Sequence, residues 1–143
     1  MPAHSAAYLA DTNVYVTAAN DDDARRKFEA FLERHGPLLV SSVVVAEVVI
    51  GIASATSREA AVHALSAGTV VVAPNADDWT RAGMAVAHLG GGILTKSRSF
   101  WNDALLAAQC ARLEVTLVTH NVKDFRRLGR YLAVHAVAPF PSR

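Results

Sequence analysis

The stretch Ala6-Ala7-Tyr8-Leu9-Ala10-Asp11-Thr12-Asn13 decides the fold, because a short apolar run ends there on a carboxylate followed by two small polar residues. We expect residues 6–10 to form a buried strand. Ligands of open α/β sheets bind at the carboxyl ends of the strands, so Asp11 is a candidate site residue. The alternative is that Asp11 only caps a following helix.

The chain of 143 residues fits a single domain, residues 1–143, that is 52% hydrophobic with a mean hydropathy of +0.22. This apolar excess predicts a buried sheet with helices on both faces, or a partner interface. No apolar run approaches the ~20 residues of a membrane span, and without an export signal we expect a cytoplasmic protein. The single Cys110 excludes an internal disulfide and a multi-cysteine zinc site, and we expect it to be a small buried side chain.

Strand-like and helix-like segments alternate along the chain, which predicts a parallel α/β sheet. Strands are expected at residues 6–10, 38–40, 69–72, 115–119 and 133–137. Helices are expected at residues 22–35, 43–53 (capped by Ser41 or Ser42), 57–67, from a cap at Asn75 or Asp77 to Gly90-Gly91-Gly92, and 100–113 (capped by Ser97 or Ser99), with a turn and short helix at 121–128.

Glu47 lies in a very apolar predicted helix. Its neighbours on the same helical face are Val43, Val44, Ile50 and Gly51, none of which can pair with a carboxylate. A buried unpaired carboxylate is costly, so we interpret Glu47 as functional. The alternative is a helix turned so that Glu47 meets water.

Asp103 and Asp124 complete a set of four candidate carboxylates. Asp103 has apolar helical neighbours, although its place in the first turn of the predicted helix also suits the helix dipole. Asp124 follows the predicted strand at 115–119 and could instead cap the turn after it.

One parallel sheet would bring Asp11, Glu47 and Asp124 together, and Asp103 can join them from its helix. Crowded like charges repel, and a divalent cation removes that conflict. Oxygen ligands indicate Mg²⁺ or Mn²⁺ rather than zinc. The side chains of Asn13, Asn121 and Thr119 can add neutral oxygens or orient water.

These residues stand in four segments that resemble, in order and spacing, the motifs of PIN domains, most closely those of VapC toxins. The segments are Asp11-Thr12-Asn13, Ser41 to Gly51, Phe100 to Ala108 and Val118 to Phe125. The resemblance covers nearly the whole chain. It implies a three-layer α/β/α sandwich with a central, mainly parallel sheet.

The resemblance further implies a Mg²⁺-dependent endoribonuclease, the toxin of a toxin–antitoxin pair, inhibited by a VapB-like antitoxin and commonly dimeric. Asp11, Glu47 and Asp103 match three acidic positions of the family. Either Asn121 or Asp124 fills the fourth, because many PIN domains carry Asp where this chain has Asn121. Asp11 and Asp103 would hold the metal most directly, and Glu47 would complete the shell or position the attacking water.

Two other functions stay open at this point. A phosphatase with Asp11 as nucleophile usually needs a second Asp two residues on, where this chain has Asn13. A binding module without catalysis would keep the fold alone. Five cations flank the motifs and form either a solvated face or a phosphate-binding surface: Lys96, Arg98, Lys123, Arg126 and Arg127. Trp79 and Trp101 are expected in the core or an interface.

Overall fold

The computed structural model describes residues 7–89 and 98–139. Its elements, in order, are β1 (Tyr8–Ala10), α1 (Thr12–Asn20), α2 (Asp22–His35), β2 (Val40–Ser41), α3 (Ser42–Ile50), α4 (Ala55–Ser66), β3 (Val71–Val72), α5 (Ala76–Leu89), α7 (Arg98–Leu113), β4 (Thr116–Val118), α8 (Val122–Leu132) and β5 (Ala136–Val137). The predicted ends at Gly90-Gly91-Gly92 and the predicted caps at Ser97 or Ser99 concern residues or side chains outside this description.

All strand pairs are parallel, as predicted. One sheet has the order β1-β4-β5, and β2 pairs with β3 in a second small sheet. A single parallel bridge between Leu9 and Leu39 joins the two. Ala10 pairs with Val118, so β1 and β4 end side by side and place Asp11 next to Thr119.

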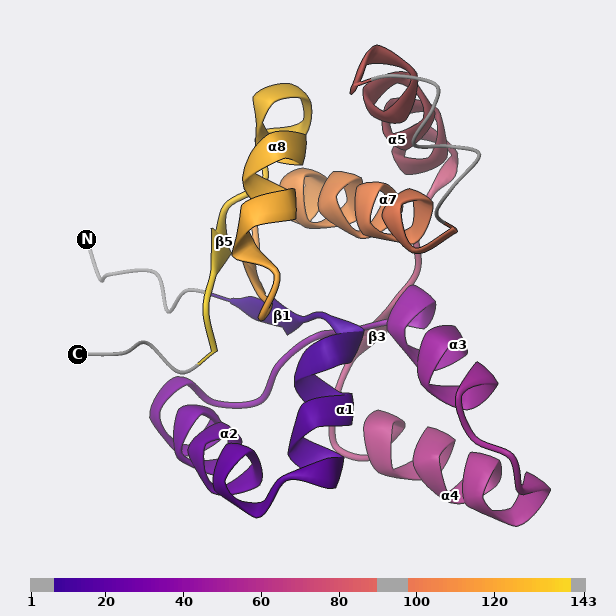
Figure 1. The fold of residues 1–143 in the computed structure, drawn as a ribbon, viewed down its shortest axis with the longest axis vertical. Helices are drawn as coiled ribbons and strands as arrows, with labels where there is room; N and C mark the ends of the chain where they lie inside the picture. Colours follow the sequence, from indigo (N-terminus) through magenta and orange to yellow (C-terminus); the bar gives the residue numbers. More distant parts are fainter. Residues whose placement is uncertain (1–6, 90–97, 140–143) are drawn as a thin grey trace.

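Alternation along β1 and β4 divides the core between two faces of the sheet. Leu9 and Leu117 belong to the larger cluster, which includes buried residues of α5, α7 and α8. Ala10 and Val118 belong to the smaller cluster, with residues of α1 and α2. Figure 1 shows α5, α7 and α8 on one side of β1 and α1 and α2 on the other. The three-layer α/β/α architecture is thereby confirmed.

The helix predicted at 22–35 is confirmed with those bounds. Asp21 caps it by accepting a hydrogen bond from the Asp23 backbone N–H. At the other end Gly36, with a φ of 80°, donates its N–H to the Leu32 carbonyl. That left-handed conformation suits glycine, which explains why the sequence marks this end so clearly.

Three helices differ most from the prediction, and α3 also ends earlier than predicted, at Ile50 instead of residue 53. Helix α1 was not predicted, since Thr12–Asn20 contains several β-branched residues and few strong helix formers. Helix α7 begins at Arg98, so Asp103 lies beyond the first turn and the helix-dipole explanation for it is wrong. Helix α8 continues to Leu132 and ends at Ala133, which is left-handed with a φ of 53° and carries no glycine signal.

Helices α5 and α7 are joined by an ion pair whose acidic partner is buried and whose basic partner is partly exposed. Asn75 caps α5, as predicted, by accepting a hydrogen bond from the Asp78 backbone N–H, and the fully buried Asp78 carboxylate accepts one from the Asn75 backbone N–H in return. The Asp78 carboxylate also accepts hydrogen bonds from Arg112 near the end of α7, with nitrogen–oxygen distances of 2.9 and 3.0 Å. Trp79 is 49% exposed and lies against Trp101, so it is only partly in the core.

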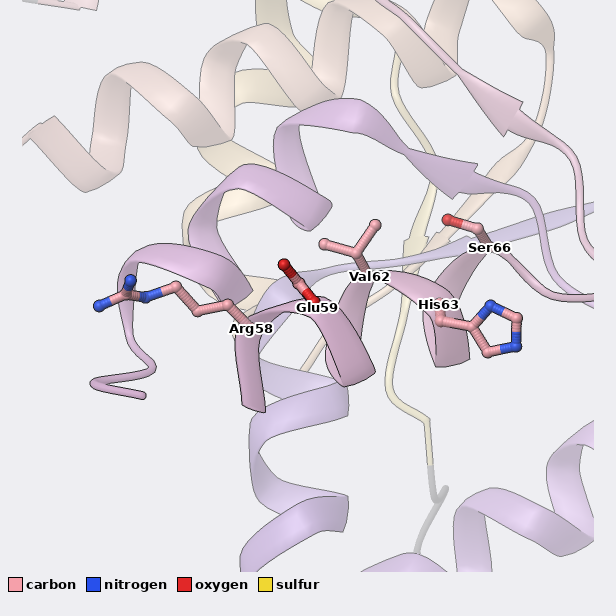
Figure 2. Close-up of a pocket in the computed structure, with 5 residues that line it drawn as sticks. All are labelled: Arg58, Glu59, Val62, His63 and Ser66. Atoms are coloured by element: carbon pink, nitrogen blue, oxygen red, sulfur yellow. The ribbon is translucent and has the colours of Figure 1, made fainter. Parts of the chain in front are cut away.

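Helices α3 and α4 contribute few fully buried side chains. Val44 is the buried residue of α3, and α4 has none. Figure 2 shows a pocket whose lining residues, Arg58, Glu59, Val62, His63 and Ser66, all come from α4. This pocket is therefore a hollow on one helix, and none of the four candidate carboxylates lines it. No helix among the described residues is long and apolar enough to cross a membrane.

Candidate active site

Asp11 follows β1 directly and is only 5% exposed. Its Oδ1 accepts a hydrogen bond of 2.8 Å from the Thr12 backbone N–H, so Asp11 does cap α1. Its Oδ2 accepts from the Thr119 hydroxyl at 2.9 Å and from the Asn13 amide at 3.1 Å. Burial raises the pKa of Asp11, and the hydrogen bonds from Thr119 and Thr12 oppose that rise.

Thr119 and Asn13 connect β1 with the segment that follows β4. The Thr119 hydroxyl oxygen accepts from the Asn121 backbone N–H at 3.0 Å, and the Asn13 side-chain carbonyl accepts from the His120 backbone N–H at 3.2 Å. Both side chains therefore hold Asp11 and the β4–α8 turn in a fixed relation. We predicted them to orient water or add oxygens. The structure places them beside Asp11.

Glu47 does not lack partners, and the sequence expectation was wrong on this point. Its Oε1 accepts a hydrogen bond of 2.7 Å from the Thr12 hydroxyl, and its Oε2 accepts one of 3.3 Å from the Asn102 amide. The flank is not solidly buried either, because Ile50 is 81% exposed. A helix that is apolar on every side shows no periodic alternation of apolar and polar residues, so its buried face cannot be predicted from the sequence.

Asp103 lies on α7 just before the fully buried run Ala104 to Ala108. Burial is the largest of the causes that raise its pKa to about 8, and the like charges of Asp11, Glu47 and Asp124 raise it further. Such a charge interaction requires proximity. The four predicted carboxylates, carried by four different segments of the chain, therefore converge on one region.

Asp124 and Asn121 both lie at this region, on α8 and at its start. The Asn121 side-chain amide donates to Asp124 Oδ2 at 2.8 Å, and Asn121 makes no side-chain cap bond to α8. Asp124 contributes the fourth carboxylate charge, while Asn121 holds that carboxylate. The two residues that the sequence offered as alternatives thus act as a pair.

The cluster is not a closed metal cage as it stands. Over residues 7–89 and 98–139, no three His, Cys, Asp or Glu side chains meet closely enough to hold an ion together. The chemistry of the cluster nevertheless fits a hard cation, since its donors are carboxylate, amide and hydroxyl oxygens. Mg²⁺ binds through one or two carboxylates and keeps several waters, so it does not require a full protein cage.

The cations that the sequence singled out are placed in part. Lys123 and Arg126 are exposed on α8, and Arg127 lies over the ring of Phe100 with its guanidinium carbon 5.7 Å from the ring centre. Arg130 is exposed on the same helix. Lys96 and the side chain of Arg98 are outside the described residues.

Sequence reasoning missed Thr12 and Asn102 as site residues. Each stands next to a carboxylate that was predicted, Thr12 after Asp11 and Asn102 before Asp103. That adjacency was the only available signal, because a lone Thr or Asn inside a helix has many structural roles. Cys110 is fully buried, as expected.

Comparison with a protein-family model matches residues 8–131 of the chain to the PIN domain. The match includes all four carboxylates and the residues that hydrogen-bond to them. No curated protein matches the chain.

Several solved structures share the fold. VapBC-1 from nontypeable Haemophilus influenzae matches with a TM-score of 0.73 and 21% identity over 94% of this chain and 98% of that one. VapBC2 from Rickettsia felis, bound to a DNA fragment from its promoter, matches with a TM-score of 0.66 and 22% identity over 92% of this chain and 97% of that one. A toxin–antitoxin complex from Klebsiella pneumoniae matches with a TM-score of 0.67 and 21% identity over 95% of this chain and 100% of that one. At these identities the likeness establishes the fold.

Proposed function

The chain belongs to the PIN-domain family, and from this premise we propose that it is a metal-dependent endoribonuclease, the toxin of a VapBC-type pair. The observation that carries the proposal is the convergence of carboxylates from four segments: Thr12 donates its N–H to Asp11 and its hydroxyl to Glu47, and burial together with the charges of Asp11, Glu47 and Asp124 raises the pKa of Asp103. Structural carboxylates are normally paired with cations. Four that gather in one region instead favour the binding of a cation from solution.

The roles of the residues follow from their contacts. Asp11 and Asp103 would hold Mg²⁺, or Mn²⁺, with Asp124 beside them. Bound there, the ion would lower the pKa of a coordinated water and stabilise charge on the phosphate. Asn13 and Thr119 donate to Asp11 Oδ2 and so fix the direction of that carboxylate. Asn121 does the same for Asp124.

Glu47 is the carboxylate best suited to position the attacking water. Both of its oxygens already accept a hydrogen bond, from Thr12 and Asn102, so the plane of the carboxylate is set. The remaining lone pairs could accept a proton from a water bound beside the carboxylate. A general base has to be held in this way, within hydrogen-bond reach of the proton it removes.

RNA is the substrate class that we propose. Lys123, Arg126 and Arg130 fall at positions i, i+3 and i+7 of α8, which puts them along one side of that helix. All three are exposed, and Lys123 stands next to Asp124 at the site. A row of cations that begins at an acidic metal site fits a phosphate backbone leading into it.

An antitoxin and a second copy of the chain are the proposed protein partners. An arginine from a VapB-like antitoxin would pair with Asp11, Glu47 or Asp103 and compete with the cation. The homodimer would cover the apolar face of α3 and α4, where Ile50 is 81% exposed and α4 buries no residue. The antitoxin partner is consistent with the fold neighbours, which include toxin–antitoxin complexes.

Cleavage of RNA by the purified protein tests the proposal. We expect cleavage with Mg²⁺ or Mn²⁺, loss of cleavage in EDTA, and recovery when either ion is returned. Asp103→Asn should lower the rate by orders of magnitude, whereas Glu33→Gln, which removes one charge from the exposed side of α2, should not. Full cleavage in a rigorously metal-free buffer would contradict the proposal.

A further inference from the structure

The hydrogen bonds to Glu47 come from two helices other than its own. Thr12 on α1 donates its hydroxyl to Oε1 at 2.7 Å, and Asn102 on α7 donates its amide to Oε2 at 3.3 Å. The two donors therefore hold both oxygens of one carboxylate. With both ends held, rotation about the last side-chain bond of Glu47 is restricted.

Each donor is the sequence neighbour of another site carboxylate. Thr12 directly follows Asp11, and Asn102 directly precedes Asp103. The backbone of α1 thus links Asp11 to one oxygen of Glu47, and the backbone of α7 links Asp103 to the other. Through these two pairs the position of Glu47 is tied to both proposed metal ligands.

Helix α3 is held by fewer buried side chains than α7, so the position of Glu47 depends more on these hydrogen bonds. Val44 is its buried residue, and Glu47 itself is only partly buried. By contrast, α7 carries the continuous buried run from Ala104 to Cys110. A side chain on a lightly packed helix would otherwise sample several rotamers, and each would place its carboxylate differently.

We propose that Asn102, together with Thr12, is a positioning residue that fixes the carboxylate of Glu47 relative to Asp11 and Asp103. This inference rests on the proposed function, because it assigns Asn102 a task within that site. Neither residue touches the reacting phosphate. They act through Glu47, as outer-shell hydrogen bonds do when they orient a ligand or a base.

Isosteric substitutions test the inference. Asn102→Leu and Thr12→Val remove the donors with little change in side-chain shape. We expect each to slow single-turnover cleavage about 10- to 100-fold, as loss of such an orienting contact does. Thr12→Ser keeps the hydroxyl and should restore most of the rate. Matched controls are Asn20→Leu and Thr80→Val, whose side chains bond only to exposed helix carbonyls and should not change the rate.

The background of Glu47→Ala separates positioning from general support of the fold. If Asn102 and Thr12 act through Glu47, their substitution should have less than about a twofold further effect once Glu47 is gone, by the logic of the double-mutant cycle. The same cycle is measured by Mn²⁺ affinity in calorimetry, which needs no cleavage. There we expect Asn102→Leu to bind Mn²⁺ more weakly than the wild type. The double variant of Glu47→Ala with Asn102→Leu should bind it no more weakly than Glu47→Ala alone.

The outcomes distinguish this inference from the proposed function. Equal losses in the wild-type and Glu47→Ala backgrounds would overturn the positioning role and make Asn102 a structural residue. Unchanged cleavage and Mn²⁺ affinity in Asn102→Leu would also overturn it, while metal-dependent cleavage by the wild type would leave the proposed function standing. A wild-type protein that neither cleaves RNA nor binds Mn²⁺ would refute both.

Discussion

Replacing Asp103 by Asn should make the metal-free protein more stable while it abolishes cleavage. The substitution keeps the size of the side chain and removes one charge from the crowded cluster. The pKa of Asp103 is raised from 3.8 to about 8, first by burial and then by the charges of Asp11, Glu47 and Asp124. The amide cannot ionise, so folding of the variant neither takes up a proton at this position nor places a charge beside the other three carboxylates.

The sign of the pH dependence follows from proton linkage. Between pH 3.8 and about 8 the folded protein holds a proton on Asp103 that the unfolded chain has released. The free energy of unfolding therefore falls as the pH rises through this window. A full shift would correspond to about 4 kcal/mol at pH 7. Because solvation by water and adjustment of the neighbouring carboxylates reduce this unfavourable interaction, we expect Asp103→Asn to raise the free energy of unfolding by about 1–3 kcal/mol.

Urea or thermal unfolding in EDTA measures the effect. The free energy of unfolding of Asp103→Asn should exceed that of the wild type by more at pH 8 than at pH 4.5. Each kcal/mol of added stability should raise Tm by ~3 °C. Added Mg²⁺ should stabilise the wild type more than the variant, because only the wild type keeps the full site. Glu33→Gln serves as the charge-matched control and should show neither difference.

Two results would refute the reasoning. If Asp103→Asn changed the stability equally at pH 4.5 and pH 8, Asp103 would not carry the shifted proton. If the variant were less stable than wild type at pH 8, the carboxylate would have a favourable partner, and the idea of four crowded charges would fail. Either result would remove the observation that supports a metal site.

Three further outcomes are expected. The double variant Lys123→Gln with Arg126→Gln should bind RNA more weakly and lower the slope of log K against log salt by about 1.4, whereas Arg34→Gln on α2 should not, as a salt titration would show. Ile50→Glu should shift the protein from dimer to monomer in light scattering, whereas Met84→Glu should leave the dimer intact, although Met84 is also exposed, at 68%. Arg112→Met leaves the buried carboxylate of Asp78 without its cation and should lower Tm more than Arg25→Met, because the pair of Arg25 with Asp22 is exposed. Scanning calorimetry measures both Tm values, and equal losses would contradict the prediction.

Much of the fold was readable because its signals are local. The strand before Asp11, the helix from Asp22 to His35 and the parallel order of the strands follow from short apolar runs, caps and a terminal glycine. Helix α1 was missed because its residues favour strands as much as helices. The end of α8 was missed because Ala133 adopts a left-handed conformation that no glycine announces.

The carboxylates of the site were readable, and their partners were not. A charged residue in an apolar segment stands out by composition, so Asp11, Glu47 and Asp103 attract notice without a structure. The donors to Glu47 come from positions 35 and 55 residues away in sequence. Such contacts depend on how α1, α3 and α7 pack together, which the pattern of one segment does not determine.

The structure also changes which residue decides between the two explanations of the carboxylates. From the sequence, capping a helix and holding a metal are rival roles, and Asp→Asn would separate them because Asn caps nearly as well. Asp11, however, has both features: it caps α1 through Oδ1 and accepts two further hydrogen bonds at Oδ2. An amide there would turn a donor toward Asn13 and Thr119, so Asp11→Asn should lose stability for reasons unrelated to the metal.

Asp103 is free of this ambiguity. It lies past the first turn of α7, so it caps nothing, and no hydrogen bond within the described residues offsets the rise in its pKa. Its raised pKa comes from burial and from the other three carboxylates. A loss of cleavage in Asp103→Asn, combined with a gain in metal-free stability, therefore points to the ionisable carboxyl group of Asp103 and not to a lost helix cap. Substitution of Asp103 is therefore the most direct test of the metal-site explanation.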